Sequence, residues 1–348
     1  MARPSAESKP TRTLNLALFD SSTLVGKGVK GQLARRRFPM GRVTVFDTGA
    51  MEEGGNVTEF DGEAMLATRP DFAAMESIHL AFFCGPDGSA GEYLDWPRRG
   101  GFVAIDLTLT TNRRKGIPVV NAGVNPLAVK RHEGLVASPH PASLILSTLL
   151  APLARLSALR EVASVIFQPA SEKGEEGIDE LYRQTVGVLN FTEFPKERFG
   201  GIQAFNLLRS RQSESPAFPD ELLAQEVGFI LGGARFPHAV ATLSVPVFHG
   251  HSFLCRVSFA ESVSSEALHR ALTGQEGLRR LDSGSASPAE MAGQEGIVIG
   301  EIRPDPSLPG AFWVWGVSDN LVSGTALNAV RVAEALYEQG ALSARDAS

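Results

Sequence analysis

Histidines are the side chains of this sequence best suited to acid–base chemistry, because their ordinary pKa lies close to neutral pH. His251 lies in the segment Gly250-His251-Ser252, and His249 lies two residues before it. Residues two apart on a strand share a face, so both imidazoles could face one metal ion. No third or fourth ligand is evident, and no metal site is predicted. We expect His251 to act either as an acid–base group or as a structural hydrogen-bonding residue.

The two cysteines, Cys84 and Cys255, are the only thiols of the chain. Cys84 follows an apolar run, and a reactive thiolate there would need a nearby cation or helix terminus to lower its pKa. The sequence shows neither, so we expect both cysteines to be buried and inert. Ser138 and Ser143 have no visible base partner, which argues against serine chemistry. So few cysteines exclude a disulfide scaffold and are typical of a reducing compartment.

The composition of the chain indicates which class of protein positions these residues. The chain has 348 residues, of which 43% are hydrophobic and 21% charged, which indicates a globular protein of two domains. Thirty-three basic and thirty-nine acidic side chains give a net charge of −6. This balance argues against a dedicated nucleic-acid binder. No signal peptide or membrane span is recognisable, so we expect a soluble cytoplasmic protein without a membrane partner.

The first half of the sequence alternates short apolar strands with helical segments. A strand, a polar turn and a helix over 24–37 lead into a second strand, which is the pattern of a βαβ unit. The strands are expected at 14–19, 43–47, 78–83, 102–106 and 117–120. Such alternation predicts an α/β fold with a Rossmann-type, doubly wound parallel sheet covered on both faces.

The second half has more widely spaced elements. Helices are expected at 142–156, 177–189, 220–231 and 324–337, strands at 162–167, 239–248 and 253–259, and loops at 209–219 and 282–296. This arrangement predicts an α+β domain with a mixed, mainly antiparallel sheet. The domains are placed at 13–137 plus 321–340 and at 138–320, with flexible tails at 1–12 and 341–348.

The turn after the first strand is the expected place for a nucleotide phosphate, because ligands of such sheets bind beyond the carboxyl ends of the strands. A phosphate turn usually spaces glycines three apart, but here Asp20 and Thr23 hold two of those places and only Gly26 remains. Asp47 ends the second strand, where an acidic residue could bind a ribose. The candidate cofactor-binding residues of the turn itself are Ser22, Thr23, Leu24, Val25 and Gly26. The alternative is a Rossmann-like domain that binds no nucleotide.

The order of segments resembles the aspartate-semialdehyde dehydrogenase family from Leu14 to Leu336. The strongest match is Val317-Ser318-Asp319-Asn320-Leu321 with Leu327-Asn328-Ala329-Val330, and further matches are Phe167-Gln168, Gly177 to Leu181, Ala204-Phe205-Asn206, Val245-Pro246-Val247 and Gly250-His251-Ser252. The resemblance implies a Rossmann domain, a catalytic and dimerisation domain, and a returning C-terminal helix. It also implies NADPH-dependent reduction of aspartyl phosphate in amino-acid biosynthesis, through a cysteine thioester.

The family's catalytic residues are only partly retained. The resemblance assigns the acid–base histidine to His251, the active-site glutamine to Gln168 and a cofactor contact to Asn320. The nucleophile position falls in Ser138-Pro139-His140-Pro141-Ala142, so that Pro141 stands where the cysteine belongs. His140 could line the same site or be a polar residue at a helix entry.

Other functional positions of the family are changed as well. Ser244 replaces the substrate arginine, and Gly123 replaces an acidic residue. A lysine position is matched by Leu223, and a phosphate arginine by Asn112, for which Arg113 or Arg114 could substitute. The acidic run 172–176 replaces a small Gly/Ala-rich loop beside the active-site glutamine, and its charge would repel an anionic substrate.

Two functions are therefore expected. The first is a degenerate, cysteine-less paralogue without the family's dehydrogenase activity, a pseudoenzyme retained for binding, regulation or assembly. It would form a homodimer or pair with an active paralogue. The second is an oxidoreductase that uses NAD or NADP on another aldehyde or oxo group, with His251 as the acid–base group. The changed glycine turn argues against cofactor binding, and the family resemblance argues for it.

Overall fold

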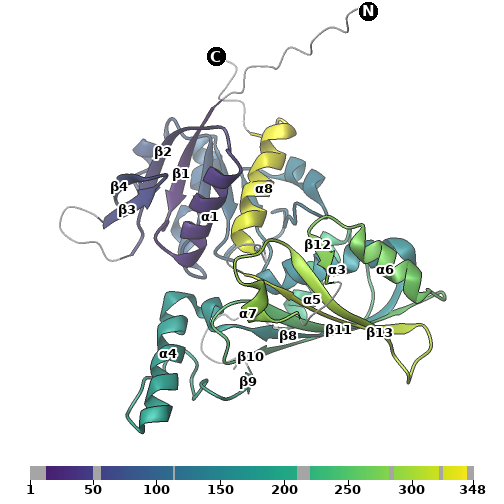
Figure 1. Cartoon of the computed structure of the whole chain (residues 1–348). Helices are drawn as coiled ribbons and strands as arrows, with labels where there is room; N and C mark the ends of the chain where they lie inside the picture. Colours follow the sequence, from purple (N-terminus) through teal and green to yellow (C-terminus); the bar gives the residue numbers. More distant parts are fainter. Residues whose placement is uncertain are drawn as a thin grey trace, which may run out of the picture.

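The computed structural model describes residues 13–49, 56–112, 114–209, 220–281, 286–320 and 324–342. The described chain forms two α/β lobes, each built on its own sheet, and Figure 1 shows the smaller sheet above the larger one. This is the two-domain α/β fold that the sequence predicts. None of the described helices combines the length and the apolar character that crossing a bilayer requires.

The first sheet has five strands in the order β2-β1-β5-β6-β7, and all of its neighbours pair in parallel. The strands are β1 (Leu14–Phe19), β2 (Met40–Phe46), β5 (Leu80–Phe83), β6 (Val103–Asp106) and β7 (Leu135–Ala137). The chain runs outward from β1 to β2 and then crosses to β5 on the other side of β1. The carboxyl ends of β1 and β5 therefore form the switch point at which such sheets bind ligands.

Both faces of the five-stranded sheet are covered. Leu16 and Leu18 pack toward α1 (Leu24–Arg35) and α8 (Thr325–Glu338), which returns from the C-terminal end of the sequence and lies beside α1 in Figure 1. Ala17 and Phe19 alternate to the other face and pack in a cluster that includes Tyr93 and Trp96. The helical segments before the second lobe are η1 (Ala73–Met75), η2 (Ser89–Tyr93), α2 (Trp96–Gly100) and η3 (Pro126–Arg131).

Two features of this lobe differ from the sequence prediction. The expected strand at 117–120 is wrong: only Val119 pairs, as an isolated bridge to Ala137, and the edge strand is β7 instead. Pro118 lacks the amide that a continuous ladder needs. An unpredicted hairpin joins β3 (Asn56–Phe60) and β4 (Glu63–Ala67) through a tight Asp-Gly turn whose two residues both have positive φ.

The second lobe is built on a seven-stranded mixed sheet in the order β12-β13-β14-β11-β8-β10-β9. Four of its strand pairs are antiparallel and two are parallel. The strands are β8 (Leu159–Gln168), β9 (Leu208–Arg209), β10 (His238–Ser244), β11 (His251–Phe259), β12 (Leu278–Arg280), β13 (Ile297–Pro304) and β14 (Ala311–Ser318).

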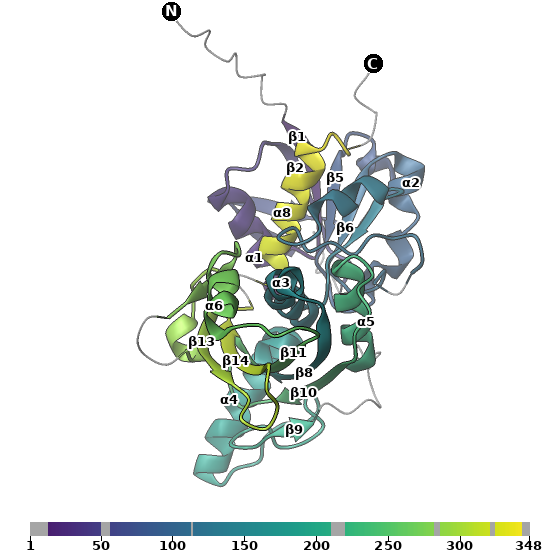
Figure 2. The same ribbon diagram turned by 90° about the vertical axis from the view of Figure 1, so that its right-hand side faces the viewer.

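Helices cover one face of this sheet. Figure 2 shows α3 (Pro141–Leu156) between α5 (Asp220–Ile230) and α6 (Ser265–Thr273), and their apolar side chains pack with those of β8, β11 and β14. The remaining elements are η4 (Ala170–Lys173), α4 (Gly174–Asn190) and α7 (Pro288–Met291). Helix α4 projects from the rest of the lobe in Figure 1.

The sequence prediction of this lobe is incomplete at several places. Strand β10 ends at Ser244 and not at Phe248, since Pro246 follows. Helix α7 lies within the expected loop 282–296, of which 282–285 fall outside the described residues. Arg209 belongs to a short strand, and the rest of the expected loop 209–219 is outside the described chain. Strands β13 and β14 are not anticipated by the sequence analysis.

Candidate functional site

Strand register brings several candidate residues into one row across the large sheet, at the end where β8 and β10 finish and β11 begins. Ser244 pairs with Gln168, and His251 pairs with Ser318. Strands β8 and β11 are antiparallel with Ser252 opposite Phe167, so Gln168 and His251 are also neighbours. The sheet therefore places His251 and Gln168 side by side, with Ser244 at the position next to Gln168.

Helix α3 begins directly above this row. Pro141 is its first residue and His140 is its N-cap, whose Nδ1 accepts a hydrogen bond from the Ala142 amide at 3.1 Å. Proline fits the first helical position because that amide has no partner within the helix. The segment in which the resemblance places the nucleophile thus ends in a regular helix start, whose first residue is a proline.

A carboxylate joins the two histidines of the site. Glu172 Oε2 lies 2.9 Å from His251 Nε2, and Glu172 Oε1 lies 3.4 Å from His140 Nε2. The His251 side chain is fully buried, and those of His140 and Glu172 are 8% and 19% exposed. The sequence analysis places Glu172 beside Gln168 but misses this contact, because the reach of a side chain from a short loop leaves no periodic signal.

The charges of this cluster depend on one another. Burial opposes ionisation of Glu172, yet the charges of His251 and His140 outweigh it and hold the pKa of Glu172 at about 2. Burial lowers the pKa of His140, while the Glu172 carboxylate partly counteracts that effect. Glu172 is consequently ionised near neutral pH.

Asn320 ties the loops around the cluster together. Its Oδ1 accepts a hydrogen bond from the Gly250 amide at 2.8 Å, and its Nδ2 donates to Ser171 Oγ at 2.9 Å. Gly250 has a φ of +87°, so the chain turns sharply before β11 begins. His249 therefore lies outside the strand and not on one strand face with His251, which corrects the sequence prediction. In the described chain, no group of three or more His, Cys, Asp or Glu side chains is suited to hold a metal ion.

A second buried carboxyl group lies beneath the start of α3. Glu226 Oε2 accepts a hydrogen bond from the His140 amide at 3.0 Å, and Oε1 accepts one from Asn112 Nδ2 at 2.6 Å. Burial raises the pKa of Glu226 to about 7 despite these hydrogen bonds. The sequence analysis does not select Glu226, although it shares an apolar helix stripe with Leu223 and Val227.

The first turn of the five-stranded sheet keeps part of a phosphate site. Thr23 caps α1 by accepting from the Gly26 amide at 3.1 Å and donating to the Cys84 carbonyl at 2.7 Å. A β-carbon on Gly26 would lie 2.5 Å from Ser21 Cα, which explains why glycine is required there. Among the described residues, the amides of Ser22, Leu24 and Val25 donate no hydrogen bond within the protein. They offer N–H groups to an anion.

Acidic side chains oppose a larger anion at the same turn. Asp20 has a φ of +54°, and its carboxylate accepts from the Thr48 amide at 2.7 Å. Burial raises the pKa of Asp20, although the Thr48 hydrogen bonds work against this. Lys27, in the first turns of α1, is paired with Glu175 from the other lobe at 2.5 Å. The free amides are placed to bind an anion, and the Asp20 carboxylate would repel a diphosphate at the same turn.

Asp47 has local partners. One of its oxygens accepts from the Gly49 amide at 3.0 Å and the other from Asn56 Nδ2 at 2.6 Å. A ribose hydroxyl would have to share these oxygens. The other candidate cofactor residues are divided between the lobes. Those of the first turn lie on the first lobe, and Asn320 lies on the second.

Neither cysteine reaches the histidines. Cys84 packs in the core of the first lobe and Cys255 in that of the second, and both are free. Burial raises the pKa of both thiols, that of Cys255 to about 11. No described thiol is therefore placed or activated as a nucleophile.

The other positions that the sequence analysis matches to functional residues of the family are described by their contacts and burial. Leu223 is fully buried in the core of the second lobe. Asn112 Nδ2 donates to Ser138 O at 3.0 Å as well as to Glu226. The amide of Gly123 donates to Asn121 Oδ1 at 3.0 Å. Arg114 is exposed, and Arg113 lies outside the described residues.

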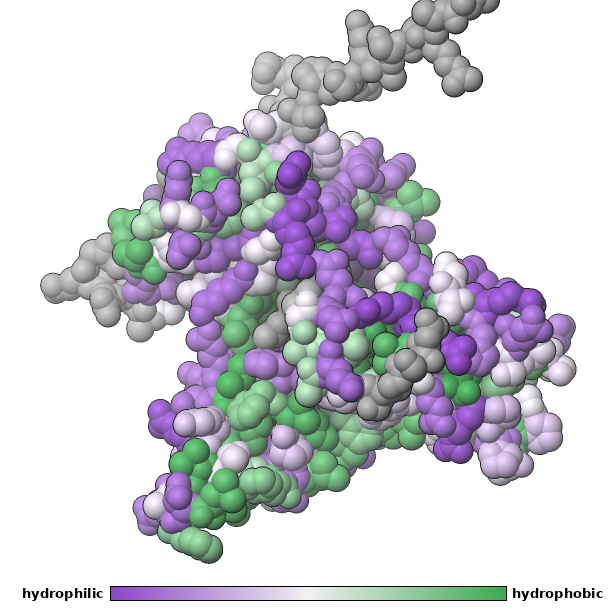
Figure 3. Space-filling view, in the orientation of Figure 1, coloured by the Kyte–Doolittle hydropathy of each residue, from purple (hydrophilic) through white to green (hydrophobic). Residues whose placement is uncertain are grey.

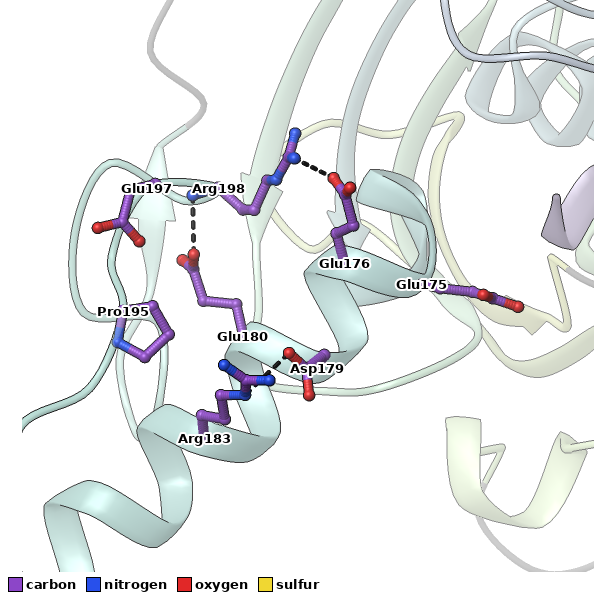
Figure 4. A pocket seen from close by; sticks show the side chains of 8 residues that line it. All are labelled: Glu175, Glu176, Asp179, Glu180, Arg183, Pro195, Glu197 and Arg198. Atoms are coloured by element: carbon purple, nitrogen blue, oxygen red, sulfur yellow. Dashed lines mark hydrogen bonds and ion pairs between the residues drawn. The ribbon is translucent and has the colours of Figure 1, made fainter. Parts of the chain in front are cut away.

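An open groove of about 500 Å³ runs along α4, and Figure 4 shows its charged lining. Glu176 is paired with Arg198, and Asp179 is paired with Arg183 at 2.9 Å. The buried Glu180 accepts from the Arg198 amide at 2.9 Å. Because these carboxylates already have partners, the groove is less suited to a ligand than the buried histidine cluster.

Comparisons with known proteins agree with this architecture. The sequence model of the semialdehyde dehydrogenase dimerisation domain matches residues 150–323. The chain is 27% identical to aspartate-semialdehyde dehydrogenase of Prochlorococcus marinus, over 94% of this chain and 97% of that protein. It is 29% identical to a USG-1 protein homolog of Azotobacter vinelandii, over 94% and 98%.

Solved structures give the same result. A probable aspartate-semialdehyde dehydrogenase from Pseudomonas aeruginosa is 27% identical and matches with a TM-score of 0.86, over 94% of this chain and all of that one. The Candida albicans enzyme, solved with NADP, is 15% identical and matches with a TM-score of 0.71, over 94% and 100%. At that identity the second likeness concerns the fold alone.

Proposed function

Because the chain belongs to the semialdehyde dehydrogenase family, we propose that it is a paralogue without the family's thioester-forming reduction, retained for binding and assembly. The observation that carries this proposal is Pro141 at the first position of α3, above the row that contains His251 and Gln168. A thioester requires a thiolate within reach of the substrate carbonyl, and proline supplies no nucleophile.

The contact between Glu172 and His251 supports the same proposal. An acid–base histidine has to present a nitrogen to the reacting group. His251 Nε2 instead lies 2.9 Å from the Glu172 carboxylate. That negative charge would also repel an anionic acyl phosphate. The missing nucleophile and the repulsive carboxylate therefore act against the same step.

Assembly is proposed to use the face of the large sheet opposite α3, α5 and α6, where α7 covers the end beside Trp315. Val165 pairs with Leu254, and Leu254 pairs with Trp315, so these three half-buried side chains form an apolar row across β8, β11 and β14. The opposite face packs on α3, α5 and α6. A second copy of this chain would cover the row, in keeping with the match to a dimerisation domain.

Helix α4 and its surroundings would extend this interface. Exposed apolar residues gather on the projecting part of the lobe, which is the lower left of Figure 3. They include Tyr182, Leu189 and Phe191, of which Phe191 is 97% exposed. Large apolar side chains in such a cluster are typical of protein contact surfaces. The same surface could pair with an active paralogue, and co-expression of two differently tagged chains would distinguish the two partners.

A second candidate function is an NAD(P)-dependent oxidoreductase that acts on another aldehyde or oxo group. The free amides of Ser22, Leu24 and Val25 favour it, because they leave an anion-binding helix start beside the switch point. In that case the cofactor would supply hydride chemistry. His251 would hold or deliver a proton at Nε2, and Gln168 would orient the carbonyl group beside it.

Calorimetric titration with NADPH and then NADH separates the two candidates. We expect no binding tighter than roughly 100 μM, which corresponds to about −5.5 kcal/mol. Tighter binding would favour the oxidoreductase, and a screen of carbonyl substrates with a His251→Ala control would follow. Turnover of aspartyl phosphate by the pure wild-type protein, at a rate typical of enzymes, would overturn the proposal of a paralogue without this activity.

A further inference from the structure

The histidine cluster has the form of an occupied anion-binding site. Two buried imidazoles, from the N-cap of α3 and the start of β11, face opposite oxygens of one carboxylate. A carboxylate with so little exposure needs hydrogen-bond donors or a positive charge beside it, because its desolvation is costly. Glu172 places its carboxylate within 3.4 Å of both Nε2 atoms, where a ligand carboxylate would otherwise find both histidines.

The position of Glu172 is fixed by the backbone around it. The Ala170 amide donates to Val247 O at 2.8 Å, and the Ser171 amide donates to Phe248 O at 3.0 Å. These bonds hold η4 against the loop that leads into β11. A β-carbon on Gly177 would lie 2.5 Å from the Ala170 carbonyl oxygen, so glycine allows α4 to start close to this turn.

We propose that Glu172 is an internal ligand of a small-carboxylate site formed by His140 and His251, and that it excludes free anions from this site. The inference rests on the proposed function, since it names the ligand class of the same site. Glu172 is thereby the residue that determines charge specificity: without its side chain the site takes up a small carboxylate, and with it the site rejects one.

The test uses the chemical fragment that one substitution removes. Glu172→Ala deletes a CH2–COO⁻ group, whose free counterpart is acetate. We expect acetate to bind this variant with a Kd at least about tenfold lower than its Kd for the wild-type protein. Calorimetry gives the two affinities, and the rise of the melting temperature with acetate gives an independent readout.

Matched controls isolate the site from general salt effects. Glu176→Ala removes the same fragment from the same acidic run, but its carboxylate faces Arg198 at the surface, as Figure 4 shows. Acetate should not bind this control variant more tightly than wild type. Chloride at equal ionic strength and neutral acetamide should not reproduce the effect on Glu172→Ala. Equal acetate affinity in the wild-type protein and both variants would overturn the proposal.

A second measurement covers the case in which Glu172→Ala does not fold. Glu172→Gln keeps the shape of the side chain and removes its charge. Because the Glu172 carboxylate raises the pKa of the His140 imidazole, NMR titration should show that pKa lower in the variant than in wild type. An unchanged His140 titration would contradict the proposed pairing. These readouts require no turnover, so activity on aspartyl phosphate would overturn the proposed function without changing them.

Discussion

The Glu172 carboxylate and the His251 imidazole form a buried contact of 2.9 Å across the candidate site. Glu172 comes from η4, directly after β8, while His251 begins β11, the antiparallel neighbour of β8. The histidine to which the resemblance assigns the acid–base role thus has a neighbour that belongs to this chain's own acidic run. This contact therefore affects the charge of the candidate site, the stability of the protein at acid pH and the ligands that the site accepts.

Acid stability should depend on Glu172. Its pKa of about 2 in the folded protein is lower than the ordinary value of 4.5, so its stabilising contribution is present at pH 5. That contribution, on the order of 3 kcal/mol, is lost as the pH falls from 4.5 toward 2. We therefore expect the difference in melting temperature between wild type and Glu172→Gln to shrink between pH 5 and pH 3. A constant difference over this range would contradict the ion pair, and Glu176→Gln serves as the exposed control.

Glu226 should have the opposite effect on stability. Its folded-state pKa of about 7 exceeds the ordinary value of 4.5, so the folded protein holds a proton that the unfolded chain releases. Stability should fall as the pH rises from about 4.5 to 7, by on the order of 3 kcal/mol. Urea denaturation of Glu226→Gln should show a flatter dependence on pH over this interval than wild type. Parallel curves for the two proteins would refute the raised pKa.

The native thiols should be unreactive. Cys84 and Cys255 are buried, and a pKa of about 11 leaves the Cys255 thiolate on the order of a thousandth of the population at pH 8. Iodoacetamide should therefore label neither residue in the folded protein and both in denaturant, as counted by mass spectrometry. Val57→Cys is the positive control, because the Val57 side chain is 73% exposed and a thiol there is open to the reagent. Rapid labelling of wild type without denaturant would show that a native thiol is accessible after all.

Gly26 and Gly31 lie on the same helix but should respond differently to alanine. A β-carbon on Gly26 meets the Ser21 backbone at 2.5 Å, and one on Gly31 meets nothing within 4 Å. Overpacking at Gly26 should cost about 1–3 kcal/mol. Alanine at the exposed Gly31 should stabilise the protein by about 0.5–1 kcal/mol, through helix propensity. Thermal denaturation of both variants tests this, and equal effects would contradict the close approach of α1 to the turn.

Much of the fold can be predicted from the sequence because its signal is local. Strand β1 shows an uninterrupted apolar run that suits a sheet covered on both faces, and the sequence prediction of 14–19 matches it. The proline that begins α3 and the Gly250 turn are likewise visible in the sequence. The pairing of β13 with β14 is harder to predict, because the register shifts between Ile299 and Glu301 and interrupts the alternation of β13.

The candidate site is less predictable than the fold. Family resemblance selects His251 and Gln168, and strand register places them side by side. The same sequence indicates repulsion of anions by the acidic run. It does not indicate that Glu172 alone turns inward while Glu175 contacts Lys27 and Glu176 contacts Arg198. All three residues are glutamates of one acidic run, and only the fold of η4 and α4 gives them different contacts.

The sheet face opposite α3, α5 and α6 provides the last prediction. Leu254 is half buried at the centre of the row formed by Val165, Leu254 and Trp315, so a charge there would have to be desolvated when a second copy covers it. Leu254→Arg should raise the dimer dissociation constant at least about 100-fold, or about 2.7 kcal/mol, and leave the monomer folded. Sedimentation velocity over a concentration series gives the dissociation constant, and circular dichroism checks the fold. Val57→Arg is the control, since Val57 is 73% exposed on the separate β3–β4 hairpin. If Leu254→Arg remains as dimeric as this control, the dimer uses another surface, and α4 with Phe191 becomes the next region to test.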